Sequence, residues 1–293
     1  MEFTIENEIL RVCVSSRGAE LVSVVKKETG EELLWNADPA VWNRHAPMLF
    51  PYCGRLKNGR YTHKGTSYEG GPHGFARDME HTLEDKSAAS VTLSLEANAL
   101  TMGKFPFAFK LTTTFALDGG TLHQNVVVHN DSDEEMPFGL GFHPGFQCPF
   151  DSAHKAEDYV LRFSQPESPT VIKTGETDGL VTGETYRFFE NGTEIPLSDD
   201  TFAHDSICFS GLRSQRMSLV EKDSGRAIHV DIQGFPYVLA WSAKGPLRFV
   251  CIEPWKSLPD ARTASGEWSE KPAAAVLKPG EDYSTDLTME FAR

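Results

Sequence analysis

The stretch Arg248-Phe-Val-Cys-Ile-Glu-Pro-Trp255 gives the first indication of the fold. Four apolar residues, Phe249 to Ile252, lead directly into Glu253, and an apolar run of this length predicts a buried strand. Pro254 restrains the backbone of Glu253 to an extended conformation. Apolar neighbours would raise the pKa of this carboxyl group toward the range of a general base. The same pattern also fits a strand that ends in a solvated glutamate before a turn, so both interpretations stand at this point.

Alternation of apolar and polar residues recurs on both sides of this stretch. Such period-two segments predict strands that have one buried face. The clearest examples are Leu10 to Val14, Val91 to Leu95, Leu111 to Leu117, Ile228 to Ile232 and Leu287 to Phe291. Turn sequences such as Asp118-Gly119-Gly120 and Pro279-Gly280 separate many of these segments. We therefore predict an all-β, mostly antiparallel sandwich that forms a single domain over residues 1–293.

Two segments are harder to assign. From Ser94 to Leu100 a helix is possible, but the preceding alternation favours a strand. Residues 166–169 and 175–183 are rich in Pro and Gly, which predicts one long surface loop.

Charge and composition exclude several functional classes. A net charge of −14 argues against a surface for nucleic acids or anionic membranes. The first residues have no basic and apolar segments of a secretory signal, and no apolar run reaches the ~18 residues of a membrane helix. Five scattered cysteines without a CxxC pair argue against a disulfide framework or a zinc ribbon. We expect a cytoplasmic protein with reduced thiols and without a nucleic-acid or membrane partner.

Two stretches that contain glycine carry cationic or ionisable side chains. Arg55 follows an apolar approach in residues 49–59, where its guanidinium would offer a planar set of donors. His73 lies between Pro72 and Gly74, and Arg77 follows beside Asp78. Glycine lets the backbone approach a ligand closely. The alternative interpretations are a surface arginine in a turn and an incidental histidine in a glycine loop.

Two further stretches carry an ionisable residue among aromatic residues. His143 precedes Pro144 and is flanked by Phe142 and Phe146, which repeats the arrangement of Glu253 before Pro254. Asp205 precedes a short apolar run, where its carboxylate would bind a polyol or cap a turn.

These residues form an acid–base set. The sequence contains no HExxH zinc helix, no GxSxG elbow and no GxxxxGK[ST] phosphate loop. Glutamate and histidine can hold pKa values on either side of neutrality, which suits proton removal at one oxygen and proton delivery at another. Aromatic faces such as Trp255, combined with carboxylate and guanidinium groups, suit a sugar.

Four motifs, taken in order, resemble the aldose 1-epimerase (galactose mutarotase) family, most closely its LacX-like branch. They are LFPYCGRLKNG at 49–59, PHGFARD at 72–78, GFHPGF at 141–146 and FVCIEPW at 249–255. The resemblance implies an antiparallel β-supersandwich with a concave sugar-binding face. It also implies interconversion of the α and β anomers of a free aldose without a cofactor. The sequence itself shows no metal motif, so we predict no metal ligands among the site residues.

The resemblance also implies roles for individual residues. Glu253 matches the catalytic base, and His143 matches the catalytic acid. His73, Arg55 and Asp205 match the second active-site histidine, the substrate-binding arginine and the sugar-binding aspartate. We add Arg77 and Trp255 as substrate-binding candidates. A small sugar is the expected partner of a monomer or homodimer.

Two alternatives to a mutarotase of free aldoses remain open. One is a hexose-phosphate 1-epimerase, which needs extra cations such as Arg77 and Lys256 near the site. The other is a non-catalytic carbohydrate-binding protein on the same scaffold. Residues 256–260 depart from the family pattern, which leaves the shape of one wall of the site open.

Overall fold

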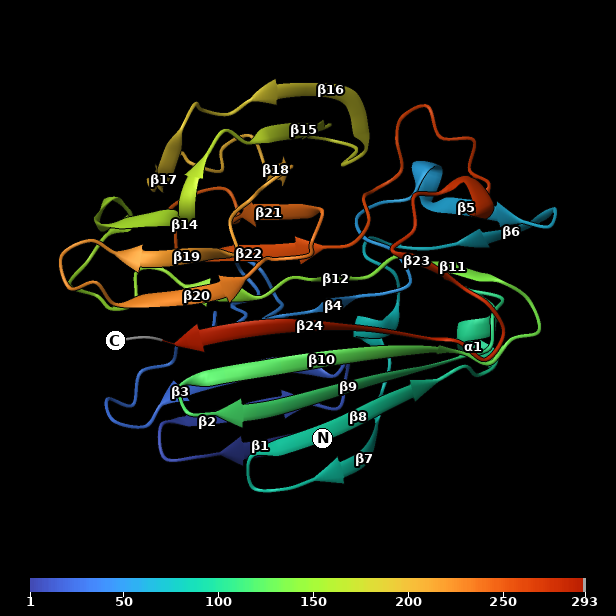
Figure 1. Ribbon diagram of the computed structural model, residues 1–293, viewed down its shortest axis with the longest axis horizontal. Helices are drawn as coiled ribbons and strands as arrows, with labels where there is room; N and C mark the ends of the chain where they lie inside the picture. The colour runs from blue at the N-terminus through green and yellow to red at the C-terminus, as the bar shows by residue number, and fades with distance from the viewer. Residues whose placement is uncertain (292–293) are drawn as a thin grey trace.

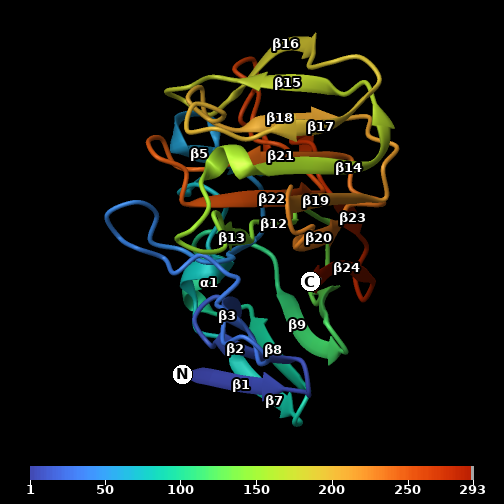
Figure 2. The ribbon, with the colours of Figure 1, turned by 90° about the vertical axis from the view of Figure 1, so that its left-hand side faces the viewer.

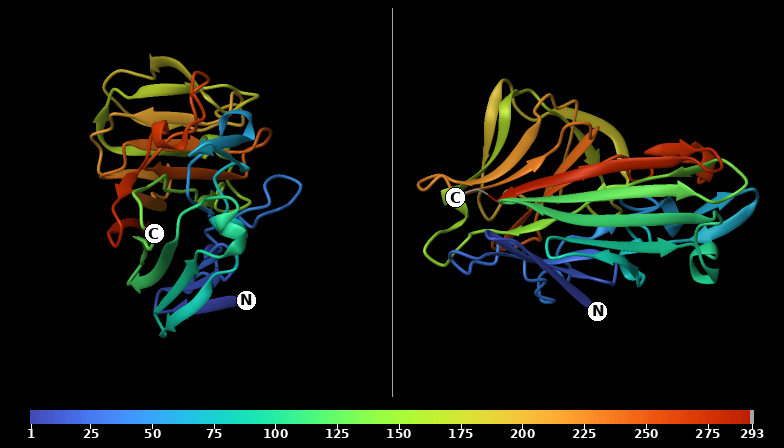
Figure 3. Two further views of the ribbon diagram at one scale, coloured as in Figure 1. Left: turned by 90° about the vertical axis from the view of Figure 1, so that its right-hand side faces the viewer. Right: turned by 60° about the horizontal axis from the view of Figure 1, so that its bottom comes forward.

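Two large antiparallel sheets make up most of the fold in the computed structural model, which describes residues 1–291 (Figure 1). Within these residues the larger sheet has nine strands in the order β17-β14-β19-β20-β24-β10-β9-β8-β7. These strands are β7 (Thr82–Lys86), β8 (Ser90–Glu96), β9 (Phe109–Asp118), β10 (Thr121–Asn130), β14 (Tyr159–Glu167), β17 (Gly192–Pro196), β19 (Arg216–Glu221), β20 (Ala227–Asp231) and β24 (Asp282–Phe291). Its long strands β24, β10, β9 and β8 run side by side in the right-hand view of Figure 3.

The second sheet, with eight strands among residues 1–291, has the order β16-β15-β18-β21-β22-β12-β4, and β13 also pairs with β22. These strands are β4 (Met48–Leu49), β12 (Gly141–Phe142), β13 (Gly145–Gln147), β15 (Thr170–Thr174), β16 (Val181–Arg187), β18 (Ile207–Ser210), β21 (Tyr237–Trp241) and β22 (Phe249–Trp255). In Figure 2 strands β16, β15, β18, β21 and β22 follow one another down the upper half of the molecule.

Smaller elements complete the described chain. A three-stranded sheet of β1, β2 and β3 lies at the lower end in Figure 2, next to β7 and β8. Its strands are β1 (Glu2–Glu6), β2 (Leu10–Ser15) and β3 (Glu20–Lys26). The two-stranded pairs are β5 (Arg60–His63) with β6 (Thr66–Glu69) and β11 (Met136–Phe138) with β23 (Ala275–Leu277). The short helices are α1 (Ala99–Met102) and 3-10 turns at Lys57–Gly59, Ala76–Asp78, Ala156–Asp158 and Trp268–Glu270. None of the helices among the described residues is long and apolar enough to cross a membrane.

The predicted alternation corresponds to the buried faces of the strands. Leu111 and Phe115 in β9 are fully buried, as are Leu287 and Met289 in β24. One hydrophobic cluster includes these residues and extends from Ile5 to Phe291. Side chains alternate across a pleated strand, so burial of every second residue holds the sheets against one another. The prediction of an all-β, mostly antiparallel fold is confirmed.

Strand β22 is buried on both of its faces. Val250 and Ile252 belong to the main hydrophobic cluster, whereas Phe249 and Cys251 belong to a separate aromatic cluster. Glu253 follows on the same face as Phe249 and Cys251, because side chains two residues apart point the same way. This double burial explains why the sequence shows a continuous apolar run here in place of alternation.

Two local predictions need correction. The alternation before Leu100 ends with β8 at Glu96, and α1 begins at Ala99 because Asn98 caps it by accepting hydrogen bonds from Leu100 N and Thr101 N. The predicted long loop is interrupted by β15, and the segments on either side of this strand lie partly in β14 and β16. β-branched residues in β15 outweigh the turn formers around it.

Candidate active site

A cavity of about 330 Å³ lies over the eight-stranded sheet. Four neighbouring strands, β15, β18, β21 and β22, contribute residues to its wall, and loops supply the rest. All seven site residues predicted from the sequence line it: Arg55, His73, Arg77, His143, Asp205, Glu253 and Trp255. The cavity is therefore concave and mixes aromatic walls with convergent polar groups, as small-molecule sites do.

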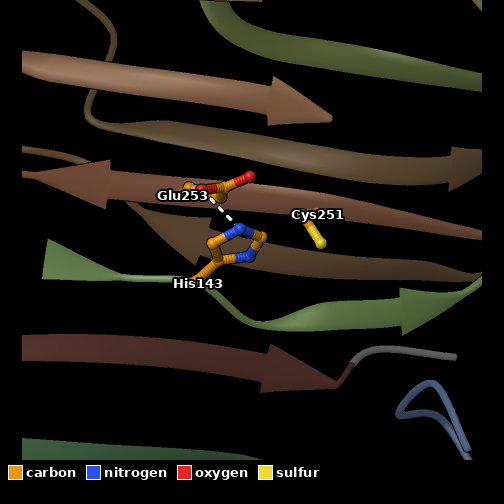
Figure 4. A group of neighbouring side chains, drawn as sticks. All are labelled: His143, Cys251 and Glu253. Atoms are coloured by element: carbon orange, nitrogen blue, oxygen red, sulfur yellow. Dashed lines mark ion pairs between the residues drawn. The ribbon is translucent and has the colours of Figure 1, made fainter. Parts of the chain in front are cut away.

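The register of the sheet places His143 opposite Glu253. Strand β12 pairs with β22 at Gly141 and Trp255, and β13 pairs with it at Gly145 and Cys251. Position 143 lies midway between these pairs and falls opposite position 253. His143 Nε2 is 3.2 Å from Glu253 Oε2 (Figure 4). The prolines that follow both residues lack an N–H group, so the regular hydrogen-bond ladder between the strands is interrupted beside this pair.

Burial shifts the pKa values of this pair in opposite directions. Glu253 is 1% exposed and His143 is 7% exposed. Desolvation, with a smaller contribution from the Asp205 carboxylate, raises the pKa of Glu253 well above its usual value. Desolvation, with a smaller contribution from the Arg77 guanidinium, lowers the pKa of His143 to about 3. Burial therefore favours the uncharged form of both partners, with one proton held on Glu253.

Two buried atoms of this pair have no hydrogen-bond partner among the described residues. They are Nδ1 of His143 and Oε2 of Glu253, whose 3.2 Å contact with His143 Nε2 does not have hydrogen-bond geometry. Buried polar atoms in folded proteins are nearly always paired, so unpaired ones in a cavity wall indicate groups that await a ligand.

His73 is held in one tautomer. The backbone N–H of Gly54 donates to His73 Nδ1 at 3.1 Å, so this nitrogen must be an acceptor and the ring proton sits on Nε2. Burial, the nearby His143 and the cation of Arg77 lower the pKa of His73 well below its usual value. His73 has a left-handed backbone with φ of 66°, which costs about 1–3 kcal/mol and is typical of functional positions. The structure thus presents a neutral hydrogen-bond donor close to His143, at 5.5 Å between ring centroids.

Arg55 and Asp205 line the cavity from loops. A Cβ on Gly179 would lie 2.9 Å from Arg55 Cδ, so only glycine at this position lets the arginine stem pack closely. Asp205 also has a left-handed backbone, with φ of 78°, two residues before β18 begins at Ile207. Its carboxylate acts on Glu253 electrostatically and leaves hydrogen-bonding capacity for a polyol.

Arg77 also lines the cavity, and a neighbouring carboxylate balances the positive charge of its guanidinium only weakly. Its Nε lies 3.9 Å from Asp78, and this buried nitrogen has no hydrogen-bond partner among residues 1–291. Arg44 competes for Asp78 through its own ion pair. A guanidinium with spare donors in a cavity can bind an anionic or hydroxyl oxygen.

The segment after β22 is fixed by buried charges. Asp260 accepts a hydrogen bond from Lys57 N at 2.8 Å, and its carboxylate lies 2.6 Å from Lys271 Nζ. The N–H of Asp260 donates to Arg55 O at 2.9 Å, which joins this segment to the Arg55 turn. The expectation that Lys256 supplies a cation to the site is wrong. Lys256 Nζ donates to Gly234 O at 2.8 Å instead, and the residue does not line the cavity.

Sequence reasoning missed two tryptophans in the cavity wall. Trp42 stacks on His143 with ring centroids 5.0 Å apart, and Trp241 meets the same imidazole edge-on at 5.5 Å. Trp241 belongs to a strand, but Trp42 lies in a loop without periodicity. The sequence signal that could have identified Trp42 was a large aromatic residue in a loop rich in Asn, Asp and Arg.

One group of side chains has ligand types that metals use. His143, Cys251 and Glu253 present ligand atoms that lie within 4.8 Å of one another (Figure 4). Burial raises the pKa of Cys251 well above its usual value, whereas a transition metal binds the thiolate. A second group of ligand-type side chains consists of Asp151, His154 and Glu221. Its carboxylates already form ion pairs with Arg226, and Asp151 also pairs with His154. The first group suits proton transfer better than metal binding, and operation without metal or cofactor stays a prediction.

Comparisons with known proteins agree with the motif resemblance. A protein-family model described as aldose 1-epimerase matches residues 1–290. Chromosomal protein LacX of Lactococcus lactis subsp. lactis is 34% identical over 286 residues, which cover 95% of both chains. The solved structure of a galactose mutarotase related enzyme from Lactobacillus acidophilus has 35% identity and a TM-score of 0.95, covering 100% of this chain and 98% of its own. A galactose mutarotase-like protein from Lactobacillus casei ATCC 334 has 32% identity and a TM-score of 0.91, with 99% of each chain covered.

Proposed function

Because this chain belongs to the aldose 1-epimerase family, we propose that it interconverts the α and β anomers of a free aldose by acid–base catalysis without a cofactor. The observation that carries the proposal is the buried pair of Glu253 and His143, 3.2 Å apart in the wall of a cavity. Burial raises the pKa of the carboxyl group and lowers that of the imidazole, so the resting pair is uncharged and one proton can pass between the two groups.

The reaction moves one proton at each of two oxygens. The Glu253 carboxylate takes the proton of the C1 hydroxyl, and the His143 imidazolium gives its proton to the ring oxygen. The bond between C1 and the ring oxygen breaks, which leaves the open-chain aldehyde. Rotation about the C1–C2 bond presents the other face of the carbonyl, and the reversed transfers close the ring as the other anomer. Each positioned proton transfer is worth ~10²–10⁴-fold in rate.

The proton count of the pair stays constant through this cycle. Ring opening begins with the proton on His143 and ends with a proton on Glu253. The uncharged pair that burial favours is therefore the form that closes the ring of an open-chain aldehyde. The ionised pair is the form that opens it, and the two forms differ only in where one proton sits.

The surrounding residues hold the sugar. His73 donates from Nε2 to an oxygen at the reacting end, where it stabilises developing negative charge. Arg55 and Asp205 hydrogen-bond hydroxyl groups, and Trp255 offers an aromatic edge beside His73. A small sugar is thus the proposed partner.

Exchange NMR of several free aldoses tests the proposal. Wild-type protein should accelerate the anomerisation of at least one sugar, and Glu253→Gln should lose nearly all of that rate. Glu167→Gln is a matched control, since Glu167 is also buried, at 2% exposed, but lies outside the cavity. Equal rates for wild type and Glu253→Gln would remove Glu253 as the base. Sugar binding without any acceleration would favour the carbohydrate-binding alternative.

A hexose phosphate is a second candidate substrate, because the unpaired donor of Arg77 offers a site for an anion. Glucose 6-phosphate should then be anomerised faster than glucose, and Arg77→Gln should remove this preference. Loss of rate on both sugars by the same factor would assign Arg77 to the common site.

A further inference from the structure

Trp42 covers the imidazole of His143. It belongs to the loop of residues 27–47 between β3 and β4, far from His143 in the sequence. The two rings stack with centroids 5.0 Å apart and planes inclined by 28°. Trp42 also stacks on Phe249 at 5.2 Å, and Trp241 meets it edge-on at 5.3 Å. The catalytic imidazole therefore packs against an aromatic cluster, and the atoms it presents to Glu253 are set by that packing.

The chain holds Trp42 in this place by several contacts. Its backbone N–H donates to Asp38 O at 2.9 Å, and its carbonyl oxygen accepts from Trp35 Nε1 at 2.8 Å. A Cβ on Gly145 would lie 2.8 Å from Cζ3 of Trp42. Real Cβ atoms essentially never approach that closely, so the glycine two residues after His143 makes room for the indole. The GFHPGF motif thus carries both the imidazole and the space for its cover.

We propose that Trp42 is a positioning residue for His143, which holds the imidazole in plane for proton transfer and favours its protonated form. The proposal rests on the proposed function of the Glu253–His143 pair. A stacked ring limits rotation of the imidazole about its side-chain bonds. The negative face of an indole attracts a cation and does so more strongly where water is excluded. Both effects act on the step in which His143 gives its proton to the ring oxygen.

Several ionisable groups around His143 favour or disfavour a positive charge on its imidazole. Glu253 on β22 lies 3.2 Å away and attracts the proton, and Cys251 on the same strand remains a neutral thiol. His73 and Arg77, from the segment after β6, disfavour a second positive charge. Trp42 does not titrate, so its contribution is the same at every pH at which the protein is folded.

Kinetics and NMR of Trp42 variants test this role. Trp42→Leu should lower kcat for the best aldose about tenfold, which lies between the worth of an exposed and of a fully desolvated cation–π contact, with KM changed less. Trp42→Phe should retain most of kcat, because it keeps an aromatic face. The ¹⁵N chemical shifts of His143 should move toward those of the neutral imidazole in Trp42→Leu and stay near wild type in Trp42→Phe. Thermal unfolding of each variant reports whether the fold is intact.

A crowding variant gives an independent test that keeps the indole. Gly145→Ala should displace Trp42 and lower kcat, and adding Trp42→Phe should restore part of the loss because the smaller ring leaves room for the new methyl group. Unchanged His143 shifts with a raised KM would overturn the proposal in favour of a sugar contact. Equal loss in Trp42→Leu and Trp42→Phe would also overturn it. Failure of the proposed function is distinct, since wild type would then accelerate no aldose while the His143 shifts could still be read.

Discussion

Replacing Glu253 with glutamine should lower activity and raise stability. The side chains have nearly the same shape, so the change removes a titratable proton and little else. Loss of one positioned proton transfer costs ~10²–10⁴-fold in kcat, which equals about 3–5 kcal/mol of transition-state stabilisation. The neutral amide can donate to His143 Nε2, so we expect the geometry of the site to persist.

The gain in stability follows from linkage. The pKa of Glu253 is raised in the folded state, so the folded protein keeps a proton that the unfolded chain has lost above its ordinary value of 4.5. The folded state then binds more protons than the unfolded state, and the free energy of unfolding falls as the pH rises. Each pH unit in this window costs wild type about 1.4 kcal/mol relative to Glu253→Gln. The advantage of the variant should therefore begin near the unfolded pKa and grow until the pH passes the folded pKa of Glu253.

Urea unfolding of both proteins at about pH 5, 6 and 7 measures this difference, provided each transition is two-state. We expect the stability of Glu253→Gln minus that of wild type to increase steadily across the series. Glu167→Gln, measured in the same series, shows how replacing a buried carboxylate outside the cavity affects the comparison. A difference that is constant or shrinks with pH would refute the reasoning, because the Glu253–His143 site would then hold no extra proton.

Three further predictions concern the residues around this pair. Asp260→Asn leaves the buried cation of Lys271 unpaired and should cost about 3–5 kcal/mol in urea unfolding, whereas Asp260→Asn with Lys271→Met should recover much of it. The kcat of wild type should show no acid limb near the ordinary histidine pKa of 6.5, because burial lowers the pKa of His143 to about 3, and it should fall once the pH passes the raised pKa of Glu253. An acid limb near 6.5 would contradict this. Gly74→Ala should lower the free energy of unfolding by at least about 2 kcal/mol in the same assay, because its φ is 72° and the new Cβ would lie 2.0 Å from a backbone oxygen; an unchanged transition would show that the backbone relaxes there.

The fold was largely predictable because its signals are local. Burial of every second residue in β9 and β24 appears directly as alternation in the sequence. Strand β22 was predictable from length and composition, although burial of both faces removed its alternation. The order of strands in the two large sheets depends on pairings between distant segments, such as β20 with β24, which no local pattern encodes.

The convergence of Glu253 and His143 on the cavity was predictable, whereas the residues that pack around them were not. Glu253 and His143 stand out because each precedes a proline at the end of an apolar segment. Trp42 could not be placed, since its loop has no periodicity and its contact with His143 spans a hundred residues. Lys256 was named as a candidate because it is close to Glu253 in the sequence. Closeness in sequence does not fix where a side chain points, and Lys256 follows the end of the strand and donates to Gly234 O.

The central position of β22 has a consequence for the mobility of the site. Its amides are bonded on one side to β21 and on the other to β12 and β13. Amides in such a strand exchange with solvent deuterium only through the largest openings of the protein, whereas loop amides around Arg55 and Asp205 can exchange through local ones. The proposed base therefore lies on a strand whose amides we expect to exchange slowly, while the proposed sugar-binding groups Arg55 and Asp205 lie on loops that can adjust. Variation in sugar preference among related chains should therefore accumulate in those loops and leave the strand unchanged.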